Sequence, residues 1–292
     1  MIRLFTDTDC DVTPALAKEH GYSGLISLPY SIDGETVYPY KDEDYVFDEK
    51  TFYDSLRNGV LPTTSALSPE AYIEYIEPVF AAGDDILYVH FSKAMSATFS
   101  NLNKALAVLK ERYPERVCHL LDTRSATTNG LNIALAIGDL FLEGKSVEEI
   151  FAWAETEIDK YAMYLFVDDL KFFHRSGRVS GLSAFMGSLL GVRPVIYMSP
   201  EGKLEAFAKV RGRANAMNRL LSMMEELGDE LTSHRVILGH TGADPAIIEE
   251  LIAMIRERFG ADLPILVQVV NPTLGSHSGP DGVAISFHAK HR

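Results

Sequence analysis

The sequence predicts an α/β fold of two lobes with largely parallel sheets. Short apolar runs rich in β-branched and aromatic residues alternate with helical patterns, which is typical of this fold class. The chain has 292 residues and 47% of them are hydrophobic, enough to bury the cores of two modest lobes. We expect an N-terminal lobe over 1–160 and a C-terminal lobe over 161–292, with a cleft between them.

The apolar runs place the expected strands. Their period and composition predict strands at 2–6, 85–91, 116–121, 163–167, 235–239 and 264–270. Helical spacing of apolar residues from Phe99 to Leu109 predicts one helix, and a capping box at Ser146 and Glu149 predicts the start of another. Asp244 before Pro245 predicts a third. The acidic, tyrosine-rich segment 33–54 lacks a clear period and predicts an extended excursion or hairpin at the rim.

Composition narrows the function class. The formal net charge of −14 repels phosphate backbones and anionic lipid head groups, so we expect neither nucleic acid binding nor stable membrane insertion. No stretch reaches ~18 uncharged apolar residues, and we expect no signal peptide or membrane span. The two cysteines, Cys10 and Cys118, form no metal-binding or disulfide pattern, which favours a cytoplasmic location.

Small polar residues follow several predicted strands. Ligands of open α/β sheets collect outside the carboxyl ends of the strands. Strand 2–6 leads into Thr6–Asp9, strand 85–91 into Ser92–Thr98, strand 116–121 into Asp122 and Thr123, and strand 264–270 into 271–280. We expect these segments to converge around a ligand, joined by Thr63–Ser65.

Two of these loops suit an anion. Ser96 and Thr98 lie at a strand-to-helix turn, where a hydroxyl and free backbone N–H groups can both donate; the alternative is that Ser96 only caps the helix. His277 and Ser278 lie in the glycine-rich stretch 275–282, where a histidine can donate to a carboxylate; the alternative is a loop histidine bonded to a carbonyl.

Basic residues are few and clustered. Arg178 lies in 171–180 and Arg211 in 209–219, and arginine suits a carboxylate, a phosphate or an acidic partner surface. A solvated or internally paired face is the ordinary alternative. Asp7 and Asp9 are weak evidence for a metal site, because an Asp in such a loop often caps a helix; a metal stays a minor alternative, and we expect no metal and no cofactor. The motifs of a nucleophile elbow, a zinc protease and a dinucleotide site are absent.

The loops together resemble the DegV family, which includes the fatty-acid-binding subunits of bacterial fatty acid kinase. The resemblance rests on the order and spacing of pieces that span nearly the whole chain: TDTDCDVT (6–13), PTTSALSPE (62–70), FSKAMSATFSN (91–101), DTRSATTNG (122–130), FFHRSGRVSG (172–181), VRGRANAM (210–217) and GSHSGPDGVAISF (275–287).

The resemblance implies two α/β lobes with a long-chain fatty acid between them. The carboxylate would be held at the loops and the tail in an apolar tunnel, for which 163–167 and 184–192 are candidate walls. A partner kinase would supply ATP chemistry and form an acyl phosphate, so this chain would be a carrier and not itself the enzyme. We expect Arg211 to face that kinase and assign the ligand-binding role to seven residues: Thr64, Ser65, Ser96, Thr98, Arg178, His277 and Ser278.

Departures from the family pattern fall near this predicted site. Lys93 stands where a second serine is usual, and Asp281 stands where the family has glycine. Lys93 would add a cation near the head group, and Asp281 would narrow a backbone approach. These two departures affect what can be inferred about the ligand's chain length and head-group geometry more than they affect the predicted fold.

Two other function classes stay open. Ser96, His277 and an acid such as Asp7 could form the nucleophile, base and orienting group of an acyl hydrolase or transferase. A regulatory or scaffold protein that holds lipid as a structural ligand would show the same sequence features as a carrier.

Overall fold

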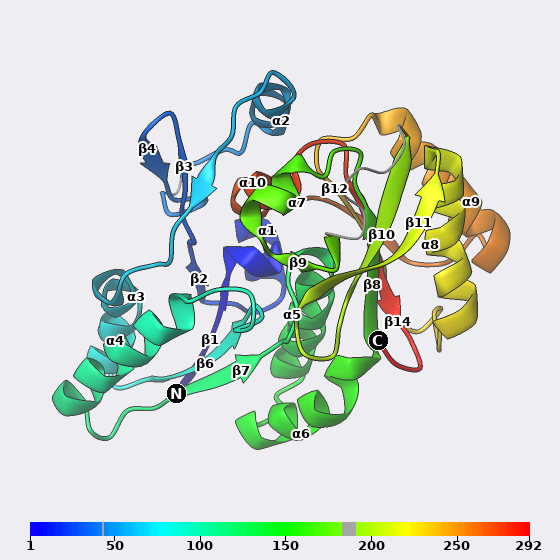
Figure 1. The fold of residues 1–292 in the computed structure, drawn as a ribbon. Coiled ribbons are helices and arrows are strands. Elements are labelled where there is room, and N and C mark those ends of the chain that lie inside the picture. The colour runs from blue at the N-terminus through cyan, green and yellow to red at the C-terminus, as the bar shows by residue number, and fades with distance from the viewer. Residues whose placement is uncertain (43, 183–190) are drawn as a thin grey trace.

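The computed structural model describes residues 1–42, 44–182 and 191–292. Its strands and helices alternate along the chain (Figure 1). The strands are β1 (Ile2–Asp7), β2 (Gly24–Ile26), β3 (Tyr30–Ile32), β4 (Glu35–Val37), β5 (Thr63–Thr64), β6 (Asp85–His90), β7 (Cys118–Asp122), β8 (Tyr161–Phe166), β9 (Val179–Ser180), β10 (Val192–Met198), β11 (Leu204–Arg211), β12 (Val236–His240), β13 (Ile265–Val269) and β14 (Val283–His288). The helices are α1 (Pro14–Glu19), α2 (Glu49–Arg57), α3 (Pro69–Ala81), α4 (Thr98–Arg112), α5 (Thr127–Leu142), α6 (Val147–Glu157), α7 (Lys171–Ser176), α8 (Arg213–Leu227), α9 (Pro245–Phe259) and α10 (Pro272–Ser278), with short 3-10 helices η1 (Thr8–Cys10) and η2 (Ile158–Lys160).

Two main sheets and a small third one organise these elements. The four-stranded sheet has the order β2-β1-β6-β7 and is parallel throughout. The seven-stranded sheet has the order β13-β12-β14-β8-β10-β11-β9, in which only the β12–β13 and β9–β11 pairs are parallel. The α/β fold class is thus confirmed, whereas largely parallel pairing holds for the smaller sheet alone. The larger sheet differs because β10 and β11 form an antiparallel hairpin and β14 inserts between β12 and β8.

All six strands predicted from apolar runs are present as β1, β6, β7, β8, β12 and β13, with ends that differ by at most two residues. The predicted helices are also present. The Ser146 hydroxyl accepts from the Glu149 N–H while the Glu149 carboxylate accepts from the Ser146 N–H, which is the capping box at the start of α6. Asp244 caps α9 through the Ala246 N–H. None of the helices in the described ranges has the length and apolar character needed to cross a membrane.

The excursion or hairpin expected for segment 33–54 is present in its first part only. Its first part forms the β3–β4 hairpin, turned by Asp33 and Gly34 with φ angles of 51° and 85°. Positive φ at both central residues is the reason Asp-Gly suits such turns. Its last part begins α2, which Asp48 caps through the Thr51 N–H. Phe52, Tyr53 and Leu56 bury one face of α2 and were not predicted as a helix.

Helix α5 lies between the two main sheets (Figure 1). It contacts β1 and η1 on one side and β8, β12 and β14 on the other. Ten of its residues are buried, including the polar Asn129 and Asn132. The Asn129 amide donates to the Tyr161 carbonyl, and the Asn132 amide donates to the Ser286 hydroxyl. A helix that is apolar on most sides is stable only when it is covered on most sides, which is the place α5 occupies.

The central strands β8 and β14 of the seven-stranded sheet are buried on both faces. In β8, Met163 and Leu165 point into the core that holds α5 and the four-stranded sheet, whereas Tyr164 and Phe166 point into a second core under α8 and α9. The predicted lobe boundary near residue 160 stays a prediction. The strands of the smaller sheet fall within 2–122 and those of the larger within 161–288, but α5 packs against both.

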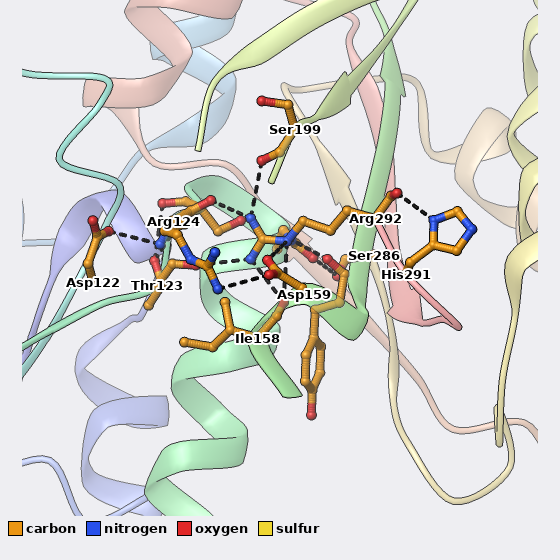
Figure 2. Close-up of polar contacts among 12 residues, drawn as sticks. Asp122, Thr123, Arg124, Ile158, Asp159, Ser199, Ser286, His291 and Arg292 are labelled. Atoms are coloured by element: carbon orange, nitrogen blue, oxygen red, sulfur yellow. Dashed lines mark hydrogen bonds and ion pairs between the residues drawn. The ribbon is translucent and has the colours of Figure 1, made fainter. Parts of the chain in front are cut away.

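A buried arginine joins the turns of the two sheets. Figure 2 shows the Arg292 guanidinium surrounded by backbone carbonyls of Thr123, Arg124, Ile158 and Ser199. Thr123 and Arg124 follow β7 of the smaller sheet, and Ser199 follows β10 of the larger one. The side chain of Arg292 is fully buried, so these contacts fix how the two turns meet.

Candidate functional site

A cavity of about 230 Å³ is lined by residues that follow strands of both sheets. Asp9 enters it after β1, Ser96 after β6, Thr127 after β7 and Val270 after β13, with His240 at the end of β12. Sequence analysis placed the ligand at such carboxyl ends. The volume exceeds the ~150 Å³ of an apolar cavity that holds benzene. The cavity is therefore large enough for part of an apolar chain.

All seven residues to which sequence analysis assigned a ligand-binding role line this one cavity. Ser65 and Arg178 are exposed at its rim, and Thr98 is fully buried. Between them lie four half-buried side chains, those of Thr64, Ser96, His277 and Ser278. Their contact with a ligand stays a prediction.

The turn after β6 places the Ser96 hydroxyl in the cavity wall. The Ser96 Oγ accepts from the Thr98 N–H at 3.2 Å, so the capping role considered for Ser96 is partly present. Its own O–H remains able to donate, because no acceptor for it occurs among the described residues. Thr98 is committed to the fold: its Oγ1 accepts from the Leu67 N–H and pairs with the Tyr72 hydroxyl at 2.9 Å. Ser96 is the better donor of the two.

His277 and Thr64 form the polar centre of the site. The His277 Nε2 and Thr64 Oγ1 atoms lie 2.9 Å apart and join α10 to β5. Burial, together with the positive charges of Arg178 and Arg175, lowers the pKa of the His277 imidazole to about 4. The ring is therefore neutral near pH 7, and a carboxylate placed beside it would favour the charged form.

A neighbouring arginine holds the Thr64 segment in place. Arg175, in α7, donates to the carbonyl of Leu61 at 3.0 Å and also to that of Pro62. Sequence analysis missed this positioning role, because the contact joins residues more than a hundred positions apart. Ser278 donates to the Leu274 carbonyl at 3.2 Å and keeps its acceptor capacity toward the cavity.

The rest of the wall is mainly apolar. Leu165, Phe166 and Val167 line it, as expected for segment 163–167. Of the other candidate wall, 184–192, residues 184–190 lie outside the described residues. Further apolar side chains come from several elements: Leu28, Phe91, Met95, Phe173, Leu204, Val270, Leu274 and Val283. The site thus combines a polar rim with an apolar interior.

Two polar side chains of the inner wall were not predicted as ligand contacts. Asp9 is 8% exposed and its Oδ1 has no hydrogen-bond partner among the described residues. His240 lines the same cavity with an unpartnered Nδ1. Burial raises the pKa of Asp9 well above its usual range, and the nearby Asp7 and Asp11 raise it further. In the sequence, the only signal for a ligand contact at Asp9 is its position directly after a predicted strand.

Three other residues singled out in the sequence lie away from the cavity wall. Arg211 is exposed at the end of β11. Lys93 pairs with Asp122 at 3.7 Å, and Asp281 pairs with Arg57 at 2.7 Å. Sequence analysis expected both residues near the head group, but neither lines the cavity. Asp281 has a φ of 63°, the left-handed region in which glycine is favoured.

The hydrolase arrangement of Ser96, His277 and Asp7 is not assembled. The Asp7 carboxylate accepts from the Cys10 and Phe91 N–H groups and from the Tyr88 hydroxyl. His277 pairs with Thr64, and the hydrogen bonds of the described residues join none of the three proposed triad members to another. No group of three or more metal-ligating side chains occurs in the described part of the chain.

The chain is similar to known proteins over its full length. The model of the uncharacterised DegV family matches residues 1–290. A DegV domain-containing protein of Clostridium perfringens is 31% identical over 286 residues, covering 97% of this chain and 96% of the relative, and one of Clostridium acetobutylicum is 28% identical over 291 residues, covering 99% and 98%.

Solved structures share the fold. A DegV family protein from Thermus thermophilus, described as fatty acid binding, superposes with a TM-score of 0.82 at 24% identity over 99% of both chains. A stearic acid-binding protein from Eubacterium ventriosum superposes with a TM-score of 0.84 at 19% identity, also over 99% of both. With the sequence matches, these results confirm the resemblance inferred from the loops: the chain belongs to the DegV family.

Proposed function

We propose that this protein binds a long-chain fatty acid and presents it to a partner kinase. The observation that carries the proposal is the single cavity lined by all seven predicted ligand residues and backed by apolar side chains. Related folds described as fatty acid binding support the same ligand class. A cytoplasmic location and the absence of catalysis by this chain itself belong to the proposal.

The head group would lie between Ser96, His277 and Arg178. Removing a carboxylate from water is costly unless several donors meet it. Ser96 has a free O–H, the imidazole is held against Thr64, and Arg178 supplies a positive charge at the rim. Charge-assisted hydrogen bonds of this kind are stronger than neutral ones and fix the orientation of the ligand.

The tail would lie in the apolar part of the cavity and supply most of the affinity. Each buried methylene contributes about 0.8 kcal/mol. A chain of roughly sixteen carbons then contributes ~10 kcal/mol before the entropic cost of binding. Head-group substitutions should therefore weaken binding without abolishing it.

Extraction of the bound ligand tests the proposal. Purified protein is denatured and extracted with organic solvent, and the released lipids are identified by mass spectrometry. We expect one intact fatty acid per chain. If no fatty acid is released, even after loading trials with a range of chain lengths, the carrier proposal is wrong.

Substitutions test the head-group assignment. We expect Ser96→Ala and His277→Leu each to weaken fatty acid binding about tenfold or more, because each removes a donor to a charged group. Ser100→Ala and His174→Leu are matched controls, since both side chains are exposed on neighbouring helices and do not line the cavity. Equal affinities for Ser96→Ala and Ser100→Ala would contradict the role of Ser96.

The kinase role requires a separate experiment. With a partner kinase and ATP, we expect acyl phosphate to form on the bound fatty acid, and none to form when the kinase is left out. Arg211→Ala should slow this step and leave fatty acid binding unchanged, because Arg211 lies outside the cavity. Arg256→Ala, on the exposed side of α9, is the control. Unchanged phosphorylation in Arg211→Ala would refute the partner-face assignment.

A further inference from the structure

Two polar side chains of the cavity wall, Asp9 and His240, have no role in the proposed head-group site. Thr127, Thr241 and Thr273 also line the inner wall, but their hydroxyls are engaged with Asp11, the Gly282 N–H and the Leu28 carbonyl. Asp9 Oδ1 and His240 Nδ1 differ, since each is buried without a hydrogen-bond partner in the described ranges. A buried polar group without a partner is costly, so a ligand that satisfies it gains affinity.

Asp9 is separated from the head-group site by the length of α10. At the start of this helix the Asn271 side chain donates to the Thr8 carbonyl at 2.6 Å, next to Asp9. At its end His277 contacts Thr64. Because an α-helix rises 1.5 Å per residue, the Asn271 end of α10 lies about 9 Å from His277 along the helix axis, so Asp9 and the head-group site lie near opposite ends of this helix.

A second carboxylate is a poor partner for Asp9. Asp7 and Asp11 flank it in the same turn, and a ligand anion placed there would meet three acidic groups. A hydroxyl is a suitable partner, because it can donate its O–H to the Asp9 carboxyl, which lines the cavity, whether or not that carboxyl is protonated. His240, at the end of β12, offers a second polar contact from the other sheet.

We infer that Asp9 forms a second polar subsite, which selects a fatty acid carrying a hydroxyl group part-way along its chain. The inference rests on the proposed function and names the substrate class more closely. The carboxylate of this ligand lies at His277 and Arg178, and the hydroxyl lies at Asp9. An unsubstituted chain gives the Asp9 carboxyl no hydrogen bond, and sites built to hydrogen-bond a hydroxyl discriminate against ligands that lack it.

The test compares ligands of equal chain length. Delipidated protein is loaded with a fluorescent fatty acid, which is then displaced by stearic acid or by hydroxystearic acids with the hydroxyl at different carbons. We expect one position to bind about tenfold more tightly than stearic acid, and other positions to show no gain. Equal affinity for stearic acid and every hydroxystearic acid overturns the inference but leaves the carrier proposal standing. Failure of all of them to bind overturns both.

Two variants assign the preference to Asp9. Asp9→Leu should reduce the ratio between the preferred isomer and stearic acid to about one, because it removes the acceptor. Asp9→Asn should retain the preference, because its amide oxygen still accepts the O–H. A ratio that Asp9→Leu leaves unchanged overturns the assignment. If Asp9→Leu does not fold, the comparison of ligands on the wild-type protein still tests the inference, because it needs no variant.

Discussion

Arg292 offers the sharpest test of how the two sheets are held together. Its guanidinium donates to the carbonyls of Ile158 at 2.9 Å, Thr123 at 3.0 Å, Arg124 at 2.5 Å and Ser199 at 3.4 Å (Figure 2). Burial lowers the pKa of Arg292 to about 10, so it stays charged at neutral pH. We expect Arg292→Ala to lower the free energy of unfolding markedly, because it leaves several buried carbonyls without a donor.

The magnitude follows from those carbonyls. Each unsatisfied buried acceptor costs about 1–3 kcal/mol, and water entering the vacated space restores part of this. Taken over four carbonyls and reduced by that water, we expect Arg292→Ala to lower the free energy of unfolding by about 3–5 kcal/mol. The loss of stability in Arg292→Lys should lie between zero and that of Arg292→Ala. An ammonium group keeps the charge, but it cannot donate to all four carbonyls as the planar guanidinium does.

Equilibrium urea denaturation of the delipidated protein measures these differences. Lys290→Ala is the control, since it removes an exposed cation two residues away and should change stability by no more than about 0.5 kcal/mol. If Arg292→Ala costs no more than Lys290→Ala, the carbonyls are satisfied in another way and the reasoning is refuted.

Three further predictions concern the loops and the cavity. Gly202→Ala should destabilise the fold by about 1–3 kcal/mol in the same denaturation assay, because Gly202 has a φ of 76° and an added Cβ would lie 2.2 Å from the Ser92 hydroxyl; an unchanged midpoint would contradict this close approach. NMR titration of the His277 ring should give a midpoint near its pKa of about 4 in ligand-free protein and a higher midpoint with fatty acid bound. The unfolded chain takes up the proton first as the pH falls, so the contribution of His277 to stability is lost between about pH 6.5 and about pH 4. A ligand-free midpoint near 6.5 would refute the burial argument. The free energy of unfolding of the wild-type protein should fall relative to that of Asp9→Asn as the pH rises above about 4, by up to about 1.4 kcal/mol per pH unit. The reason is that the raised pKa of Asp9 holds a proton in the folded protein that the unfolded chain releases. If the two proteins show parallel curves of stability against pH, Asp9 is already ionised in the fold.

The sequence was informative wherever the signal was local. Apolar runs identified six strands within two residues, and the cap at Ser146 identified the start of α6. Pairing of strands is not a local property, so the antiparallel neighbours of β14 and the β10–β11 hairpin were not foreseen. The start of α2 was missed although Asp48 caps it, because the tyrosines and acidic residues before it dominate the segment.

The candidate site followed the same division. Ser96 and His277 could be predicted because each lies in a loop with a distinctive motif at the end of a strand. The contacts of Arg175 and Arg292 could not, because they join residues more than ninety positions apart. Asp9 was expected only as part of the polar segment Thr6–Asp9 and as a weak metal ligand, since its burial and its missing partner are properties of the folded cavity.

The charges along the cavity favour one orientation of a bound fatty acid. Arg175 and Arg178 lie near His277, whereas the polar group of the inner wall is the buried carboxyl of Asp9, with Asp7 and Asp11 close to it. A carboxylate is attracted to the two arginines, but beside Asp9 it would lose its hydration and meet another acid, so reversed insertion is disfavoured even though the apolar tail contributes most of the affinity. The rim residues Ser65 and Arg178 are exposed, which leaves the carboxylate close to solvent while the tail is covered. A kinase that phosphorylates the carboxylate needs this orientation, because it must reach the head group without withdrawing the chain.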